Sequence, residues 1–88
     1  MKIEYDPDKN QRNIKKRGIS FDLAHYFEWQ DAIVWRDNRQ NYGEIRYCAL
    51  GYIDKRIYHL VLTFRKNIVR VISLRKANQR EVNRYAET

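Results

Sequence analysis

The sequence is poor in the residues and segments that mark the special classes of small proteins. Its 88 residues contain a single cysteine, Cys48, so no intrachain disulfide can form, which fits a reducing compartment. No apolar run approaches the roughly 18 residues of a transmembrane helix, and the acids near the N-terminus do not suit a signal peptide. We therefore expect a cytoplasmic protein without a membrane partner, folded as one domain over residues 1–88.

The sequence also lacks the motifs of metal-dependent and nucleotide-dependent chemistry. His25, His59 and Cys48 are scattered, without the paired spacing of zinc ligands. Glycine occurs three times, and no glycine-rich phosphate loop is present. Ser20 and Ser73 lack the sequence context of a nucleophile elbow. We expect a protein that needs no metal ion and no cofactor.

Positive charge is what the sequence has in excess. Lysine and arginine number 18 against 11 acids, which gives a net charge of +7. A field this dense favours phosphate backbones or acidic proteins as partners. Seven tyrosines could stack on nucleic acid bases. The alternative is a solvated basic surface with tyrosines at the edge of the core.

Capping residues predict three helices. Asp6-Pro7 suits the start of the first helix, and Gly18 suits its end. Ser20 can cap a second helix, whose apolar residues have helical spacing. Asn78 and Glu81 have the spacing of a capping box at the start of the third. The helices are expected over residues 7–17, 21–28 and 79–86.

The remaining apolar runs predict an antiparallel sheet. Its strands are expected at Met1–Tyr5, which forms an edge, and at Ala32–Trp35, Ile45–Ile53, Ile57–Arg65 and Ile68–Arg75. The last two are apolar on both faces, which favours a central hairpin covered by helices on both sides. A two-residue turn at Lys66-Asn67 would place Thr63 opposite Arg70. The predicted fold class is α+β, a small antiparallel sheet with two N-terminal helices and one C-terminal helix.

Several arginines fall on the predicted strands. They are Arg65, Arg70 and Arg75, with Arg46 on a neighbouring strand. A buried charge needs a partner. Glu44, Glu81 or Glu87 could pair with any one arginine and only stabilise the fold, but few acids lie close to the whole group in sequence. A phosphate ligand is therefore favoured for the group.

Metal-free RNA cleavage requires a base for the 2′-OH proton, an acid for the leaving oxygen, and cations that stabilise the phosphorane. Arginine suits the last role, so Arg65, Arg70 and Arg75 are candidates. His59 is the side chain of this hairpin suited to proton transfer near pH 7, although it could equally be a half-buried structural residue. Glu44 is a weaker acid–base candidate, as are Tyr47 and Tyr85.

Three groups of residues, in order and at matching spacing, resemble the signature of the BrnT family of toxins. The opening group is Tyr5-Asp6-Pro7 with Lys9, Asn13, Lys16-Arg17-Gly18-Ile19-Ser20-Phe21 and Ala24; the middle group is Gly43-Glu44, Arg46-Tyr47 and Leu50-Gly51; the closing group is Arg70-Val71-Ile72-Ser73-Leu74-Arg75 with Ala77, Arg80-Glu81 and Tyr85. The resemblance spans nearly the whole chain.

The resemblance implies a RelE-like fold and the toxin of a bacterial type II toxin–antitoxin system, a ribonuclease that slows translation. It also implies a hetero-oligomer with a BrnA-like antitoxin, a small DNA-binding dimer whose complex with the toxin represses their operon. RNA contacts are expected at Lys16, Arg17, Arg46 and Arg80. One departure is Arg17, where the family usually has histidine; if that histidine carries a proton, this chain must use another group. The alternatives are a non-catalytic RNA- or DNA-binding module and a protein-interaction module.

Overall fold

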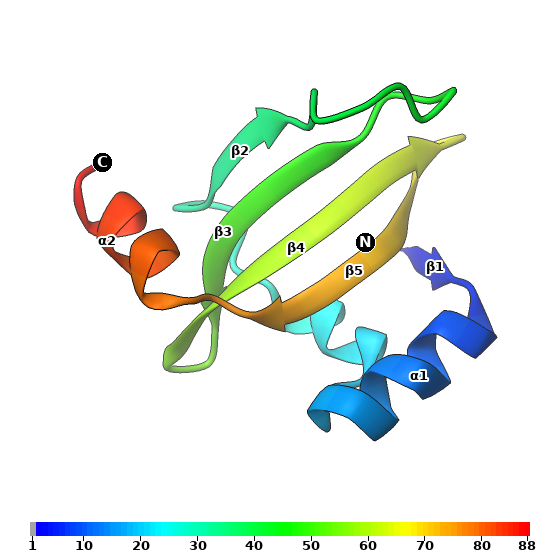
Figure 1. The fold of residues 1–88 in the computed structure, drawn as a ribbon, viewed down its shortest axis with the longest axis horizontal. Coiled ribbons are helices and arrows are strands. Elements are labelled where there is room, and N and C mark those ends of the chain that lie inside the picture. The colour runs from blue at the N-terminus through cyan, green and yellow to red at the C-terminus, as the bar shows by residue number, and fades with distance from the viewer. Residues whose placement is uncertain (1) are drawn as a thin grey trace.

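The computed structural model describes residues 2–88, which form a five-stranded mixed sheet with helices packed against it (Figure 1). The strand order is β1-β5-β4-β3-β2. The elements in chain order are β1 (Ile3–Tyr5), α1 (Pro7–Arg17), the 3-10 helix η1 (Phe21–Tyr26), β2 (Ile33–Arg36), β3 (Tyr47–Ile53), β4 (Arg56–Arg65), β5 (Ile68–Lys76) and α2 (Gln79–Ala86). Neither α-helix is long and apolar enough to cross a membrane.

Helix α1 begins and ends where its capping residues predict. The Asp6 side chain accepts a hydrogen bond from the Asp8 amide, Pro7 occupies the first turn, and Gly18 ends the helix with a left-handed φ of 70°. Polar contacts hold α1 in place. The Asn13 amide donates to the carbonyl oxygens of Ile19 and of Leu74 in β5, both at 2.9 Å. The helix is thereby fixed along the β5 side of the sheet.

The core lies between η1 and one face of the sheet. Phe21 and Ala24 are each 2% exposed and Phe27 is 4% exposed, and they pack against alternate residues of the three central strands. Because side chains alternate along a strand, the other face carries Cys48, His59 and Thr63. We call this second face the distal face. Helix α2 lies at one end of it, where Tyr85 contacts Tyr52 edge-on.

The prediction of a purely antiparallel sheet was wrong. Strand β1 pairs with β5 in parallel, with Ile3 opposite Val69 and Tyr5 opposite Val71. This contact joins the two ends of the chain, and no local pattern encodes such a pairing. The other strand pairs are antiparallel.

The prediction of two N-terminal helices, over 7–17 and 21–28, was also wrong. Only α1 is an α-helix there, and the second segment forms the 3-10 helix η1. Its buried residues, Phe21, Ala24 and Phe27, recur every three positions, which is the period of a 3-10 helix. Helices cover the two sheet faces unequally: η1 packs on the core face, whereas α2 lies at one end of the distal face and has no buried residue.

Strands β4 and β5 form the predicted hairpin, and near the turn they pair in the predicted register. Lys66 and Asn67 both have positive φ, as a two-residue hairpin turn requires, and Thr63 lies opposite Arg70. Further along, a β-bulge at Val61/Leu62 shifts the register by one residue. Arg70 and Arg75 are an odd number of positions apart, so without the bulge they would face opposite sides. The bulge brings Arg75 opposite His59 on the distal face.

Gly51 marks the tightest contact between the sheet and the core. A Cβ at this position would lie 2.6 Å from Cζ of Phe27, a buried ring that also packs edge-on against Trp29. We expect Gly51→Ala to destabilise the fold by about 1–3 kcal/mol through overpacking. The melting temperature, followed by circular dichroism, should fall by about 4–8 °C for each kcal/mol.

Phe27→Leu supplies the control for this prediction. In the double variant Gly51→Ala/Phe27→Leu the smaller side chain relieves the clash, so the loss should be less than the sum of the two single losses. Additive losses, or a Gly51→Ala variant as stable as the parent, would contradict the close contact.

Candidate functional site

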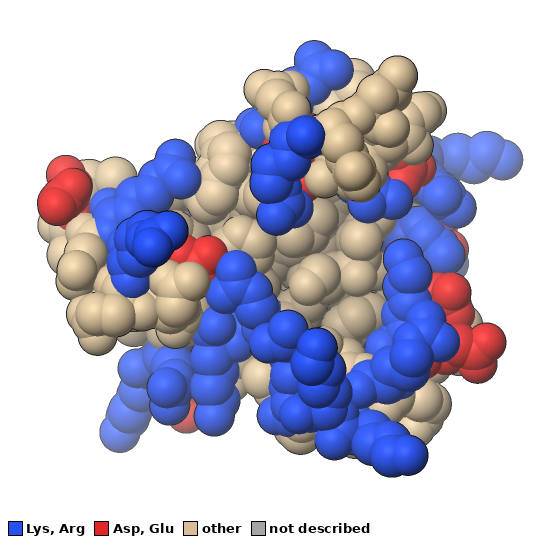
Figure 2. Space-filling view, viewed as in Figure 1, with Lys and Arg blue, Asp and Glu red and all other residues tan. Residues whose placement is uncertain are grey.

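A cleft of about 360 Å³ opens on the distal face beside β2 and β4. Its lining comprises Trp35, Arg36, Asp37, Asn38, Arg39, Cys48 and His59. Figure 2 shows this face as a hollow with a largely uncharged floor, surrounded by lysine and arginine side chains. The cleft therefore offers a neutral floor within a positive rim.

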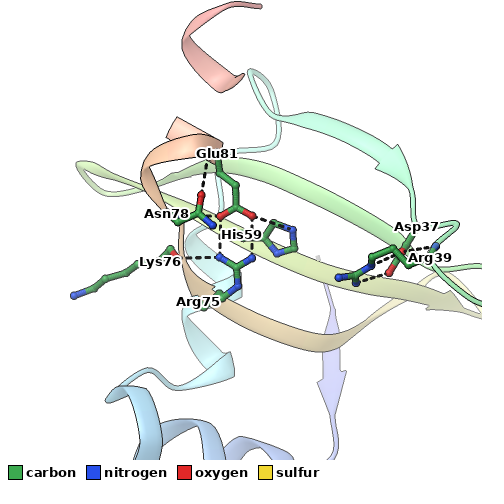
Figure 3. Close-up of polar contacts among 7 residues, drawn as sticks. All are labelled: Asp37, Arg39, His59, Arg75, Lys76, Asn78 and Glu81. Carbon is green, nitrogen blue, oxygen red and sulfur yellow. Dashed lines mark hydrogen bonds and ion pairs between the residues drawn. The ribbon is translucent and has the colours of Figure 1, made fainter. Parts of the chain in front are cut away.

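Glu81 of α2 connects the cleft to β5. Its carboxylate accepts two hydrogen bonds from the Arg75 guanidinium, at 2.8 Å each, and its Oε2 lies 3.7 Å from Nε2 of His59 (Figure 3). The same carboxylate accepts the Asn78 amide at 2.9 Å in the predicted capping box. Three elements, β4, β5 and α2, thus place one carboxylate, one guanidinium and one imidazole together.

The Glu81 carboxylate is ionised because its neighbours stabilise the charge. The hydrogen bonds from Arg75 are the main cause that lowers its pKa to about 2, with a further contribution from the Asn78 amide; burial acts in the opposite direction. The Arg75–Glu81 pair is charge-assisted and bidentate, the geometry in which arginine binds carboxylate most strongly.

His59 is neutral at pH 7. Burial lowers the pKa of its imidazole, the charge of Arg75 lowers it further, and Glu81 only partly opposes them. The side chain is buried, packs edge-on against Trp35, and has no hydrogen-bond partner for Nδ1 within residues 2–88. Because Nδ1 is buried, Nε2, which faces Glu81, is the nitrogen of this neutral imidazole that can exchange a proton at the cleft.

A second ion pair borders the cleft. Asp37, with a side chain 1% exposed, accepts hydrogen bonds from Arg39 at 2.7 and 2.8 Å and from the Tyr42 hydroxyl at 3.1 Å. The bonds from Arg39 hold the pKa of Asp37 well below its usual range, although burial opposes them. The Arg39 guanidinium points from the loop after β2 toward His59 (Figure 3).

Sequence reasoning missed several residues at this site. It left residues 36–44 between two predicted strands and assigned no role to Trp35, Asp37, Arg39 or Arg84. Arg84 of α2 lies 4.0 Å from the centre of the Trp35 ring. The close spacing of Asp37 and Arg39 was the one available signal, whereas nothing local connects Arg84 with Trp35.

The other predicted arginines, Arg46, Arg65 and Arg70, do not line the cleft, and each has a carboxylate partner. Arg70 pairs with Glu4 at 3.5 Å, while Arg46 and Arg65 share Glu44 at 3.3 and 3.4 Å. Arg70 is opposite Thr63, four residues along β4 from His59, or about 13 Å at the usual strand rise. The scarcity of nearby acids in the sequence was therefore misleading.

Glu44 is ionised as well. Burial would raise its pKa, but the hydrogen bonds and charges of Arg46 and Arg65 outweigh burial and lower it. A carboxylate in this state is a poor proton donor at pH 7.

The remaining predicted residues lie outside the cleft. Tyr47 packs against the core, on the face opposite His59. The Tyr85 hydroxyl donates to the Asp31 carbonyl oxygen, and burial is the main cause that raises its pKa. Lys16 and Arg17 are exposed on α1, and Arg80 is exposed on α2. The structure thus brings together His59 and Arg75 from the predicted set and adds Glu81.

A family model described as "Ribonuclease toxin, BrnT, of type II toxin-antitoxin system" matches residues 5–81, from the end of β1 to Glu81. No curated protein matches the chain with significant sequence similarity. The family match covers most of the chain and includes β4, β5 and the His59–Arg75–Glu81 cluster. This chain therefore belongs to the BrnT family of ribonuclease toxins, whose members act in type II toxin–antitoxin systems and have an antitoxin as their partner.

Proposed function

We propose that this ribonuclease toxin cleaves RNA at the distal-face cleft without a metal ion, with His59, which lines the cleft, as the general base and Arg75, opposite it on β5, as the phosphate-binding group. The observation that supports this most directly is the Glu81 carboxylate, which lies within reach of both side chains. In this proposal RNA cleavage takes place in the cytoplasm and slows translation, and a BrnA-like antitoxin, a DNA-binding dimer, neutralises the toxin.

Arg75 has donors to spare for a phosphate. A guanidinium carries five N–H groups, and Glu81 takes one from each terminal nitrogen, while one terminal nitrogen also contacts the Lys76 carbonyl oxygen at 3.3 Å. The Nε–H and a further terminal N–H have no hydrogen-bond acceptor in residues 2–88. Glu81 fixes the plane of the guanidinium, so these donors are oriented before the substrate arrives.

The chemical step needs no metal in this account. His59 accepts the proton of the ribose 2′-OH, O2′ forms a bond to phosphorus, and the P–O5′ bond breaks. Water in the open cleft gives a proton to the leaving O5′, and His59 then returns its proton to solvent. Arg75, with Arg39 across the cleft, stabilises the charge that develops on the phosphorane oxygens. Arg17 carries no proton in this mechanism. An arginine at the position where the family usually has histidine is therefore compatible with cleavage.

The other predicted residues act on RNA binding in this proposal. Arg65 and Arg70, with Arg46, contact phosphates farther along the strand by exchanging their carboxylate partners. Glu44 holds two of these arginines in position. Lys16, Arg17 and Arg80 contribute to the basic surface outside the cleft.

A non-catalytic RNA-binding role is the second candidate. It is favoured by the carboxylate partners that Arg65, Arg70 and Arg75 already have. Retained RNA binding without cleavage would distinguish this role from the first.

We expect His59→Gln and Arg75→Lys each to reduce cleavage of a purified RNA at least about 100-fold. Loss of a general base lowers the rate about 10²- to 10⁴-fold. Loss of one oriented hydrogen-bond donor lowers it about 10²-fold. The measurement is the single-turnover cleavage rate, with melting temperature recorded for each variant.

Arg70→Lys is the matched control, since it makes the same substitution on the same strand and face, but at a position opposite Thr63 and not opposite His59. It should retain most of the cleavage rate. If Arg70→Lys and Arg75→Lys lose activity equally, or if His59→Gln cleaves at the parental rate, the cleft is not the catalytic site.

The rate of cleavage should depend on pH through His59. A general base must be deprotonated, and burial lowers the pKa of this imidazole from its usual 6.5. Cleavage should therefore have reached its plateau at pH 7 and fall only at pH values below 6.5. A kcat/KM profile that is still rising above pH 6.5 would contradict this assignment.

A further inference from the structure

Among the described helices and strands, α1 carries the largest group of cations that form no ion pair. This helix carries five cations, Lys9, Arg12, Lys15, Lys16 and Arg17, against the single acid Asp8. None of the five forms an ion pair within residues 2–88. Arg65, Arg70 and Arg75 of β4 and β5, in contrast, are paired with Glu44, Glu4 and Glu81. Helix α1 therefore presents a local cluster of positive charge beside the sheet.

The helix dipole accounts for only part of this arrangement. Lys15, Lys16 and Arg17 lie in the last turn, where cations are favoured. Lys9 and Arg12 lie in the first two turns, where the dipole gives them no stabilisation. Lys9, Arg12 and Lys16 are spaced three and four positions apart, so they form a stripe along one side of the helix.

This stripe borders a groove of about 380 Å³ between α1 and β5. Lys9, Arg12, Lys16 and Arg17 line one wall, and Ile72 and Ser73 of the bulged part of β5 line the other. Strand β1 pairs with β5 only as far as Val71, so no strand of the described chain covers this edge. The hydrogen bond from Asn13 to Leu74 holds the two walls together.

We propose that this groove, which we call the α1 groove, binds the backbone phosphates of RNA that extends beyond the cleft. The inference rests on the proposed function, because it extends the same substrate from Arg75 past Ser73 to α1. Two residues of strand separate Ser73 from Arg75, about 7 Å at the usual rise. Figure 2 shows lysine and arginine side chains gathered beside the floor of the distal face, over the region that α1 occupies in Figure 1.

The groove's chemistry favours a phosphate backbone over an acidic protein segment. The four cations that line it are exposed, and its two apolar residues, Phe21 and Ile72, are buried or half-buried. A peptide segment would need an exposed apolar anchor here, since anchors of that kind supply most of the binding energy in protein interfaces. Backbone phosphates need only positive charge along a line, and Lys9 and Lys16 span about 10 Å along the helix.

The test compares two triple variants with equal charge loss. One removes the stripe, with Lys9→Gln, Arg12→Gln and Lys16→Gln. The control removes three exposed cations in or beside the β3–β4 and β4–β5 turns, with Lys55→Gln, Arg56→Gln and Lys66→Gln. The affinity of each for a long, labelled 2′-O-methyl RNA is measured over a range of salt concentrations. Cleavage of a dinucleotide that fills only the cleft is measured in parallel.

The stripe variant should bind the long RNA at least about tenfold more weakly. The slope of log affinity against log salt concentration should be shallower by about 2, because each lost contact with a single strand lowers the slope by about 0.7. The control should change much less, and dinucleotide cleavage should be unaffected in both. Equal losses in the two variants would overturn the proposal, because they would indicate only the general positive field. Retained RNA affinity with lost antitoxin binding would also overturn it, in favour of a protein site. A parent that cleaves no RNA would contradict the proposed function, while the salt dependence would still report on the groove.

Discussion

The Glu81 carboxylate is the contact on which the distal face depends. It binds Arg75 through two hydrogen bonds, approaches His59 and completes the N-terminal cap of α2. Helix α2 buries no residue of its own, so polar and aromatic contacts hold it at the end of the sheet. One acidic side chain therefore positions a helix, a guanidinium and an imidazole together. The same negative charge limits how far burial can lower the pKa of His59.

Charge pairing divides the protein into two regions with different roles. On β4 and β5, glutamates pair with Arg65, Arg70 and Arg75 and hold them in defined orientations, which suits a site that must bind one phosphate accurately. On α1 the cations are solvated and unpaired, which suits attraction of a polyanion without regard to sequence. The cations of α1 can then attract an RNA strand, and the same strand can be cleaved beside Glu81.

Local signals in the sequence predicted the parts of the fold that local interactions decide. Asp6-Pro7 and Gly18 set the ends of α1, and Lys66-Asn67 set the register of the β4–β5 turn. Contacts between distant residues could not be read in this way, and they include the parallel pairing of β1 with β5. His59 and Arg75 could be named as candidates, but the bulge at Val61/Leu62 that brings them together leaves no pattern in the sequence. The η1 segment was misread because buried residues every three positions resemble an α-helical face over so short a length.

The central claim is that His59 is a neutral proton acceptor held between Arg75 and Glu81. An NMR titration of the imidazole protons tests it directly, with His25→Gln used to assign the signals of the two histidines. The account predicts a pKa for His59 below the usual 6.5, and a lower value still in Glu81→Gln, where the positive charge of Arg75 is no longer offset. A pKa at or above 6.5 in the parent, or one that rises in Glu81→Gln, would contradict it.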